Sequence, residues 1–384
     1  MNILFVFPYP INPSAGGVQR VTEVLTKELQ RRGHHVVFLS YEWDEDYNFV
    51  APHYFVPIHS WNPQEIQDRL FAIVREHSIS IAICQVINSP LRAYIPSFVK
   101  VVSVCHIQPF NLDNLSRRRI LELYPTNFRQ RIAKCIGFLF PWLYVWYCER
   151  PEKKGYISAF QTDDKVCFIS ERFYPRLLKH IPTLPQHKLC AIHNPNTFAL
   201  KVSHLQRENI VLFVGRMSFF EKNPMDFVRA WDLMRKKYPS WKAIAIGEGD
   251  TDELAYIRNY IQKHKIENIE FLGKRSDVRD FYERAKFVII PSFGESWCMV
   301  LTEAMSCGCV PCVYDTYETL HDIVDDDQNG LIAETSPLAL VKRLQPYMDD
   351  DIERERLSQN ARRKVELFNV ENIVEQWEKL LHTI

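Results

Sequence analysis

Short apolar runs alternate with stretches of helical spacing along the whole chain. Most of these runs contain no polar residue, which is typical of strands buried on both faces of a parallel sheet. The predicted strands of the first half are residues 2–7, 36–40, 79–84, 101–105, 166–169 and 190–192. Those of the second half are residues 210–214, 242–246, 269–272, 287–290 and 309–313. Two such halves predict an α/β protein in which two doubly wound sheets face a cleft.

The pattern also predicts the first helix and the domain boundary. Over residues 18–32, apolar side chains recur on one helical face, and Gly33 ends the helix; they are Val18, Val21, Leu25 and Leu29. Residues 194–208 are polar and contain Pro195, which predicts a linker. The predicted domains are therefore residues 1–198 and 199–369.

Length and composition agree with this organisation. A chain of 384 residues suggests two domains, and 46% hydrophobic with 24% charged residues is typical of a soluble globular protein. Lysine plus arginine equals aspartate plus glutamate at 47 each, so no global charge favours nucleic acid as a partner. The segment from Met1 to Pro8 lacks a basic leader and is expected to be the first strand. Ten cysteines without such a leader then imply a reducing, cytoplasmic location.

Two carboxylates follow the predicted strand at 287–290. If a helix begins near Ser296, Glu295 lies in the loop at its mouth and Glu303 lies about two turns further along. Ligands of parallel sheets bind at the carboxyl ends of the strands, where two carboxylates can bind separate hydroxyl groups of one molecule. The alternative is a pair of glutamates on an ordinary charged helix.

A basic loop follows the predicted strand at 210–214. Gly215 and Arg216 begin this loop, and Lys222 comes six residues after Arg216. A guanidinium fork and an ammonium group both suit phosphate oxygens. A solvated surface loop is the alternative interpretation.

These segments, together with Ala304 to Pro311 and Asn329 to Leu331, resemble the retaining glycosyltransferases of family 4, the "group 1" enzymes of GT-B fold. The resemblance spans the chain. It implies metal-independent transfer of a hexosyl group from a nucleotide sugar, most simply a UDP-sugar, with no further cofactor. It implies a glycan or lipid-linked acceptor and a role in cell-surface polysaccharide synthesis. It also implies that a helix over residues 370–384 packs back onto the first domain.

The resemblance assigns the site residues individually. Arg216 and Lys222 are expected on the diphosphate, Glu295 on the transferred sugar and Glu303 on the ribose. Gly215, Ser296, Met299 and Val300 complete the expected donor site of the second half. Ser296 and Cys298 stand where many relatives have glycine, and Tyr314 to Tyr317 replaces a small turn, so the donor sugar stays unassigned.

The first half contributes two further candidates. Gly16 and Gly17 end the loop before the first helix, where their backbone N–H groups can approach an anion; an ordinary turn is the alternative. His106 follows the strand at 101–105 and matches a histidine that the family places near the transferred sugar, although a structural histidine is the alternative. His193 is a weaker candidate, because it stands where many relatives have proline.

Several patterns suggest metal ligands, but we predict none. Asp44 and Asp46 lie in a polar loop, and residues 325–327 lie in a turn. Cys307, Cys309 and Cys312 are too closely spaced to wrap a tetrahedral zinc ion easily.

An uncharged aromatic run extends from Cys135 to Cys148. Basic residues flank it, at Arg117, Arg118, Arg119, Arg129, Arg131, Lys134, Arg150, Lys153 and Lys154. The run is too short to span a bilayer but suits a membrane surface, which would make the protein peripheral on the inner face of a membrane. A helix covering the first sheet, or a dimer contact, is the alternative.

Two other functions share the predicted fold. A nucleotide-sugar epimerase of GT-B fold would invert the sugar without an acceptor. A non-catalytic member would bind the nucleotide sugar or hold partners together, but the presence of Arg216, Lys222, Glu295 and Glu303 disfavours it.

Overall fold

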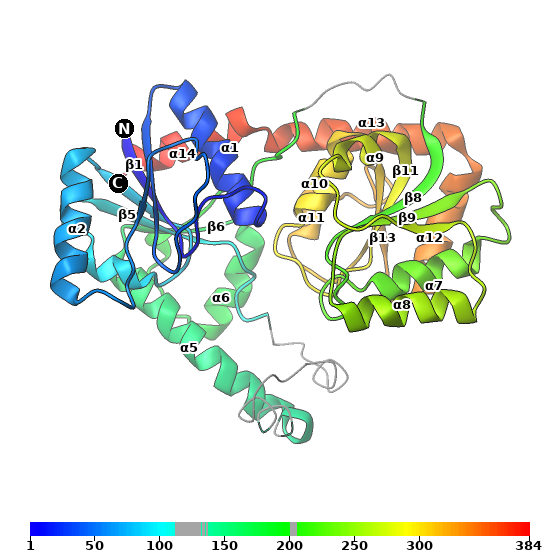
Figure 1. The fold of residues 1–384 in the computed structure, drawn as a ribbon, viewed down its shortest axis with the longest axis horizontal. Coiled ribbons are helices and arrows are strands. Elements are labelled where there is room, and N and C mark those ends of the chain that lie inside the picture. The colour runs from blue at the N-terminus through cyan, green and yellow to red at the C-terminus, as the bar shows by residue number, and fades with distance from the viewer. Residues whose placement is uncertain (112–131, 133–134, 136, 200–205) are drawn as a thin grey trace. The chain divides into compact units, whose positions relative to one another are not determined.

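The structure is a computed structural model that describes residues 1–111, 132, 135, 137–199 and 206–384. The chain forms two compact units (Figure 1). Met1–Thr197 and Val370–Ile384 form the first, and Phe198–Asn369 form the second. The boundary that we predicted from sequence lies at 198/199, and the predicted C-terminal helix belongs to the first unit.

The first unit contains a seven-stranded parallel sheet with the order β3-β2-β1-β4-β5-β6-β7. Its strands are β1 (Asn2–Val6), β2 (His35–Ser40), β3 (His53–Phe55), β4 (Ile81–Cys84), β5 (Lys100–Cys105), β6 (Lys165–Phe168) and β7 (Leu189–Ala191). Its helices of seven or more described residues are α1 (Gly17–Arg31), α2 (Pro63–Glu76), α5 (Pro141–Thr162), α6 (Tyr174–His180) and α14 (Val370–Leu381). The central strands are buried on both faces, as the uninterrupted apolar runs predict.

The second unit contains a six-stranded parallel sheet with the order β10-β9-β8-β11-β12-β13. Its strands are β8 (Glu208–Val214), β9 (Lys242–Ile246), β10 (Ile269–Phe271), β11 (Ala285–Ile290), β12 (Val310–Tyr314) and β13 (Leu331–Ala333). Its helices are α7 (Pro224–Met234), α8 (Thr251–Lys263), α9 (Val278–Arg284), α10 (Met299–Ser306), α11 (Leu320–Ile323), α12 (Pro337–Asp349) and α13 (Asp351–Val365). Trp231, Phe227 and Phe287 are fully buried in its core.

The C-terminal helix α14 is held to α1 and to the start of β2 (Figure 1). Its Trp377 is buried, and its Glu378 carboxylate lies 2.7 Å from Arg32 Nη1 and 2.7 Å from His34 Nε2. His34 Nδ1 in turn lies 2.9 Å from the amino group of Met1. These contacts attach the C-terminal helix to the first unit near the amino ends of strands β1 and β2.

Two features differ from the sequence prediction. Strands β3 and β13 have three residues each and were not predicted. Helix α10 begins at Met299 and not near Ser296, because Cys298 has a left-handed backbone with φ of 58°. Glu303 therefore lies little more than one turn into the helix.

Candidate functional site

The order of the second sheet identifies the position at which a ligand should bind. Strands β8 and β11 are neighbours, and the chain runs outward from β8 through β9 to one edge and from β11 through β12 to the other. This reversal of strand order is the switch point at which doubly wound folds bind ligands, outside the carboxyl ends of the strands. The loops that leave β8 and β11 carry Arg216, Lys222 and Glu295.

The loops after β8 and β9 are locked together through glycine. Gly215 N donates to Ile246 O at 3.0 Å, and Met217 N donates to Glu248 O at 2.8 Å. A Cβ atom on Gly247 would lie 1.8 Å from Gly215 O, so only glycine fits there. Gly247 was not predicted as a site residue, although the segment from Gly247 to Gly249 directly follows an apolar run.

A tight turn presents Lys222. The N–H groups of Lys222 and Asn223 both donate to Ser218 O, at 3.0 and 2.9 Å. Asn223 has a φ of 50° and precedes α7, and its side chain donates to the buried Asp226 carboxylate at 2.8 Å. Tyr314 OH donates to the same carboxylate at 3.0 Å, which ties the turn to β12. These partners were also absent from the sequence analysis.

Lys222 and Glu295 form an ion pair across the switch point. Lys222 Nζ lies 2.6 Å from Glu295 Oε1, and Ser292 Oγ donates to the same oxygen at 2.9 Å. Burial lowers the pKa of Lys222, but the Glu295 carboxylate, with contributions from Cys298 and Glu221, raises it, and the net pKa is raised. The Lys222 side chain is only 23% exposed.

Arg216 is positioned differently. Its side chain is 69% exposed and forms an ion pair with Glu221. Glu221 O accepts a hydrogen bond from Phe293 N at 2.8 Å, so the basic loop is bonded to the loop after β11. The same loop therefore carries an exposed cation, Arg216, and a largely buried one, Lys222.

Helix α10 begins beside this pair with uncapped donors. Its N-cap residue Cys298 contributes no side-chain hydrogen bond, and its first residues, Met299 and Val300, are half-buried. The carbonyl oxygen of Ser296 accepts from Thr319 Oγ1 at 2.6 Å, which fixes the entry to the helix. Glu303 is buried, with 3% of its surface exposed. Burial raises the pKa of the nearby Tyr282 phenol, and the negative charge of Glu303 raises it further.

In the first unit, Gly16 and Gly17 stand at the start of α1. Gly16 is the N-cap residue, and a Cβ atom there would lie 2.8 Å from Gln19 Oε1. The backbone at Gly16 is extended, with φ of 179°, so no left-handed turn requires glycine there.

His106 ends a chain of hydrogen bonds in the first unit. Thr22 Oγ1 donates to Val18 O at 2.8 Å and so accepts from Gln85 Nε2 at 3.0 Å. Gln85 Oε1 lies 2.6 Å from His106 Nε2, and we infer that this nitrogen carries the proton. His106 Nδ1 is then an acceptor, and it is buried without a partner among the described residues. Burial lowers the pKa of His106 to about 4, so the ring is neutral near pH 7.

The residues of the metal-like patterns have other partners. Lys364 pairs with Asp325, and Arg343 pairs with Asp326 and Asp327. Within the described ranges, no group of three or more metal-ligating side chains comes together. Cys307, Cys309 and Cys312 are buried free thiols. His193 Nδ1 lies 2.8 Å from Ile169 O.

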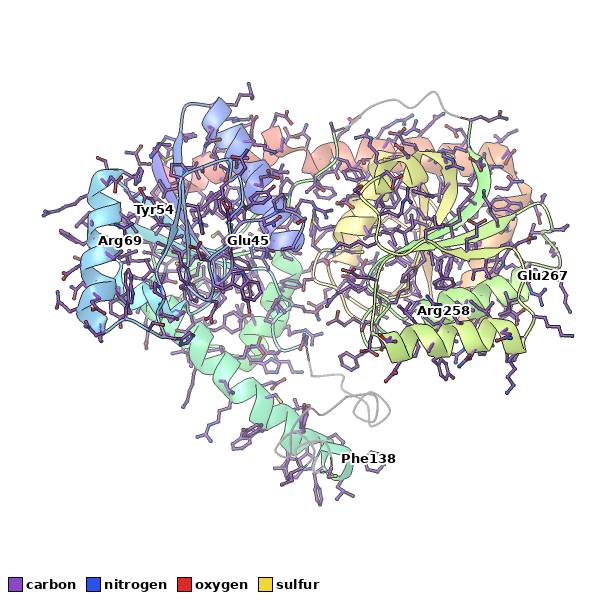
Figure 2. The ribbon with its side chains drawn as sticks, in the orientation of Figure 1. Glu45, Tyr54, Arg69, Phe138, Arg258 and Glu267 are labelled. Carbon is purple, nitrogen blue, oxygen red and sulfur yellow. The ribbon has the colours of Figure 1, made fainter. Side chains whose placement is uncertain are left out.

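The aromatic run from 135 to 148 falls partly outside the described residues, as do Arg117, Arg118, Arg119, Arg129, Arg131 and Lys134. In the described part, Trp142, Trp146 and Tyr147 are 68%, 56% and 69% exposed on α5. This half of α5 extends away from the sheet of the first unit, with Phe138 beside its free end (Figures 1 and 2). The described part of the run therefore does not cover the sheet. Among the described helices, none has both the length and the apolarity needed to cross a membrane.

Comparisons with known proteins agree with this geometry. Residues 197–364 match the sequence profile of glycosyl transferases group 1. An uncharacterized glycosyltransferase of Haemophilus influenzae is 24% identical over 381 residues, which cover 96% of this chain and 97% of the relative. A second relative, from Campylobacter jejuni, is GalNAc-alpha-(1->4)-GalNAc-alpha-(1->3)-diNAcBac-PP-undecaprenol alpha-1,4-N-acetyl-D-galactosaminyltransferase. It is 28% identical over 230 residues, 59% of each chain.

Among solved structures, HepE of Anabaena in complex with UDP and glucose superposes with a TM-score of 0.73. The two chains share 16% identity, and the match covers 100% of each. The two parallel-sheet units thus have the GT-B fold, and residues 197–364 are similar to the glycosyl transferases group 1.

Proposed function

We propose that the protein is a retaining glycosyltransferase of family 4 that transfers a hexosyl group from a UDP-sugar to a glycan acceptor. The observation that carries this proposal is the Lys222–Glu295 pair at the switch point of the second sheet. It places a cation for phosphate beside a carboxylate for sugar hydroxyls. The UDP and glucose bound by HepE support the choice of donor.

Each side chain has a distinct task in this proposal. Arg216 and Lys222 stabilise the charge that develops on the leaving diphosphate, and the uncapped N–H groups at the start of α10 add to this. Glu295 keeps Oε2 for a sugar hydroxyl, because Oε1 is occupied by Lys222 and Ser292. Glu303 binds the ribose. In the first unit, His106 Nδ1 is assigned to a hydroxyl group that donates to it.

The proposed reaction needs no metal ion. Two side-chain cations and a helix amino terminus supply the positive charge that a divalent ion supplies in other transferases. Turnover should therefore persist in excess chelator at the rate measured without it. Complete loss, restored by magnesium or manganese, would show that a metal ion holds the diphosphate.

A thermal-shift screen against UDP, GDP, ADP and CDP sugars tests the donor. A ligand at 100 times its Kd stabilises the folded protein by about 2.7 kcal/mol, so the matching nucleotide should stand out. The selected donor is then incubated with and without a glycan acceptor. Release of UDP that depends on the acceptor supports the transferase. Conversion of the sugar without acceptor favours the epimerase, and binding without turnover favours a non-catalytic protein.

We further propose that the acceptor is lipid-linked and belongs to a cell-surface polysaccharide. The Campylobacter jejuni relative is named for an undecaprenol-linked substrate. The exposed aromatic half of α5 is flanked by Arg150, Lys153 and Lys154, which suits the anionic surface of the inner face of a membrane. Contact with that surface would bring the enzyme to such an acceptor.

A further inference from the structure

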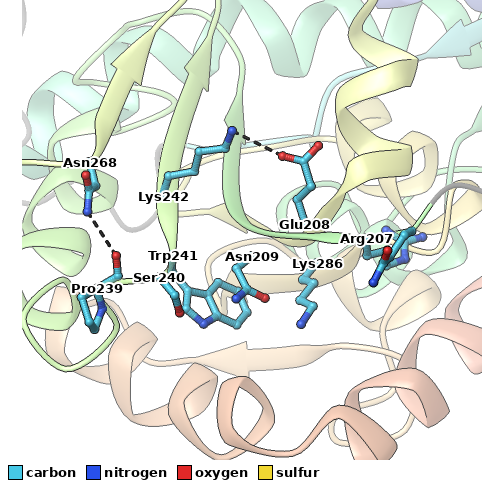
Figure 3. A pocket seen from close by; sticks show the side chains of 10 residues that line it. Arg207, Glu208, Asn209, Pro239, Ser240, Trp241, Lys242, Asn268 and Lys286 are labelled. Carbon is cyan, nitrogen blue, oxygen red and sulfur yellow. Dashed lines mark hydrogen bonds and ion pairs between the residues drawn. The ribbon is translucent and has the colours of Figure 1, made fainter.

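A second group of charged side chains lies at the amino ends of the strands of the second unit. One cavity of about 690 Å³ is shown in Figure 3 and is lined by Gln206, Arg207, Glu208, Asn209, Pro239, Ser240, Trp241, Lys242, Asn268 and Lys286. A smaller cavity of about 320 Å³ shares three of these residues and adds Asp351, Arg354, Glu355 and Arg362. Strand β8 has seven residues, so roughly 20 Å separate these cavities from the Lys222 loop.

Four cations converge on the smaller cavity, namely Arg207, Lys286, Arg354 and Arg362. Arg354 is only 7% exposed and Lys286 only 9% exposed. Both contact the carboxylate of Asp351, with Lys286 Nζ at 3.1 Å. The Asp351 side chain is 70% exposed, so water weakens its hold on the two buried cations.

Arg207 has a structural role that explains its burial. Its guanidinium donates to the carbonyl oxygens of Tyr282, Ala285 and Cys307, which lie at the carboxyl ends of α9 and α10. A cation at that end of a helix is stabilising. Lys286 Nζ lies 5.2 Å from the centroid of the Trp241 ring, and Arg362 Nη2 donates to Cys307 O at 3.3 Å. These contacts do not account for the Nε–H groups of Arg354 and Arg362.

Two guanidinium donors at the smaller cavity have no acceptor. Arg354 Nε and Arg362 Nε are buried and make no hydrogen bond within the part of the chain that the structure describes. A buried donor of a charged group is costly to leave unpaired. Both side chains line the cavity, so an oxyanion there would lie beside two incompletely paired guanidinium groups.

The charges of the cluster also disfavour one another. Burial lowers the pKa of Arg354, and the nearby charge of Arg207 lowers it further. Burial likewise lowers the pKa of Lys286 to about 8, with a contribution from Arg354. An added anion would relieve this repulsion.

We propose that Lys286, Arg354 and Arg362 bind the phosphate group of a small phosphorylated molecule, whose polar remainder occupies the larger cavity. Phosphate suits the cluster because a tetrahedral anion accepts from several donors at once, including arginine forks. Asn209, Ser240 and Asn268 supply hydrogen-bonding groups in the larger cavity. The ligand is separate from the sugar donor, because it lies at the opposite end of the sheet.

Calorimetric titration of the full chain at constant ionic strength tests this proposal, with inorganic phosphate, glucose 6-phosphate and unphosphorylated glucose as probes. Both phosphates should bind saturably and glucose should not. Tighter binding of glucose 6-phosphate would assign the larger cavity to the organic part, and equal binding would assign the site to inorganic phosphate. Arg354→Gln should weaken phosphate at least about tenfold, since a hydrogen bond to a charged group is lost.

Matched variants separate binding from folding. Arg356→Gln changes an arginine two positions away that pairs with Glu353 outside the cavity, and it should leave phosphate affinity unchanged. Asp351→Asn removes the competing carboxylate and should tighten phosphate binding, which a structural role alone does not predict. If Arg354→Gln does not fold, Lys286→Met and Asp351→Asn carry the test with opposite expected signs.

Two results would overturn the proposal. One is the absence of phosphate binding at tens of millimolar. The other is phosphate binding that Lys222→Ala abolishes while Arg354→Gln leaves it intact, which would place the anion in the donor site.

Discussion

At the scale of single residues, the two cations of the basic loop differ in a way that activity and stability should report. Arg216→Ala should lower turnover at least about a hundredfold, comparable to the loss of one preorganised donor, with little change in stability. Lys222→Ala should lower turnover as much, and it should also destabilise the fold, because it leaves the Glu295 carboxylate half-buried without its cation. Steady-state kinetics and thermal denaturation measure the two effects.

Arg275→Ala is the matched control for this pair. Like Arg216, Arg275 is an exposed arginine paired with a nearby carboxylate, Asp277, but it follows the edge strand β10. Its loss should change neither property. Near-normal turnover in Arg216→Ala or Lys222→Ala would refute the assignment of that residue to the diphosphate.

Calorimetry should show different effects of Glu303 and Glu295 on ligand affinity. Glu303→Gln should weaken UDP and the UDP-sugar alike, because Glu303 is assigned to the ribose that both ligands contain. Glu295→Gln should leave UDP affinity nearly unchanged and reduce only the additional affinity of the UDP-sugar. The reverse pattern would mean that the two assignments must be exchanged.

Lys222 and Glu295, both predicted from sequence as site residues, lie together in the structure, but their hydrogen-bond partners were not predicted. Lys222 and Glu295 each follow an apolar run, so the sequence alone places both at the carboxyl edge of a parallel sheet. Their ion pair joins residues 73 positions apart and depends on β8 lying beside β11. No local period encodes that neighbour relation. Gln85 was missed for the same reason, since its side chain bonds Thr22 and His106, which lie 63 and 21 positions away. Ser292 lies only three residues before Glu295, but no sequence pattern indicated their hydrogen bond.

At the scale of elements, the strands predicted from apolar runs match observed strands within about two residues at each end. The short strands β3 and β13 lack a readable period, and their identity depends on pairing with β2 and β12. The start of α10 was predicted too early because serine before an apolar run is a common start signal. The left-handed backbone of Cys298 delays the helix, and sequence gave no sign of it.

The attachment of α14 should depend on pH. Hydrogen bonding to His34 lowers the pKa of the Glu378 carboxyl below its usual 4.5. A lowered pKa stabilises the fold above pH 4.5, and this stabilisation disappears as the pH falls through the folded-state value. Glu378→Gln should therefore lower the urea midpoint of the first unit at pH 7, by about 1 kcal/mol in unfolding free energy. The difference from wild type should shrink under acid conditions.

Glu375→Gln provides the comparison on the same helix. Glu375 pairs with Lys379 one turn away, and both side chains are more than half exposed. Its replacement should have a smaller effect that salt removes. Equal effects of the two variants at pH 7 would show that the bonds from Glu378 to Arg32 and His34 contribute nothing specific.

At the scale of the whole molecule, the α/β class and the two-sheet architecture followed from alternation alone. The order of strands within each sheet did not, because it depends on which crossover packs on which face. The fate of the 135–148 run was also open, since an aromatic helix can cover a sheet or face outward. The hydrophobicity of the segment is similar whether it covers a sheet or faces outward. The structure shows its described tryptophans exposed, which only tertiary packing could decide.

The exposed half of α5 gives the last prediction, that the protein docks on anionic membranes without spanning them. Trp142 and Trp146 lie one turn apart on α5, and the Arg150 guanidinium lies 5.2 Å from the centroid of the Trp146 ring. Each basic side chain near an anionic surface contributes about 1 kcal/mol, which salt screens, and the tryptophans add an apolar anchor. Co-sedimentation with liposomes should require anionic lipid, weaken at high salt and weaken in a Trp142→Ser, Trp146→Ser double variant. Trp43→Ser, which removes a tryptophan that is 58% exposed elsewhere in the first unit, should bind like wild type. Because all three side chains are exposed, each variant should keep its melting temperature. A wild type that ignores anionic liposomes would instead leave this surface to a second copy of the chain or another protein.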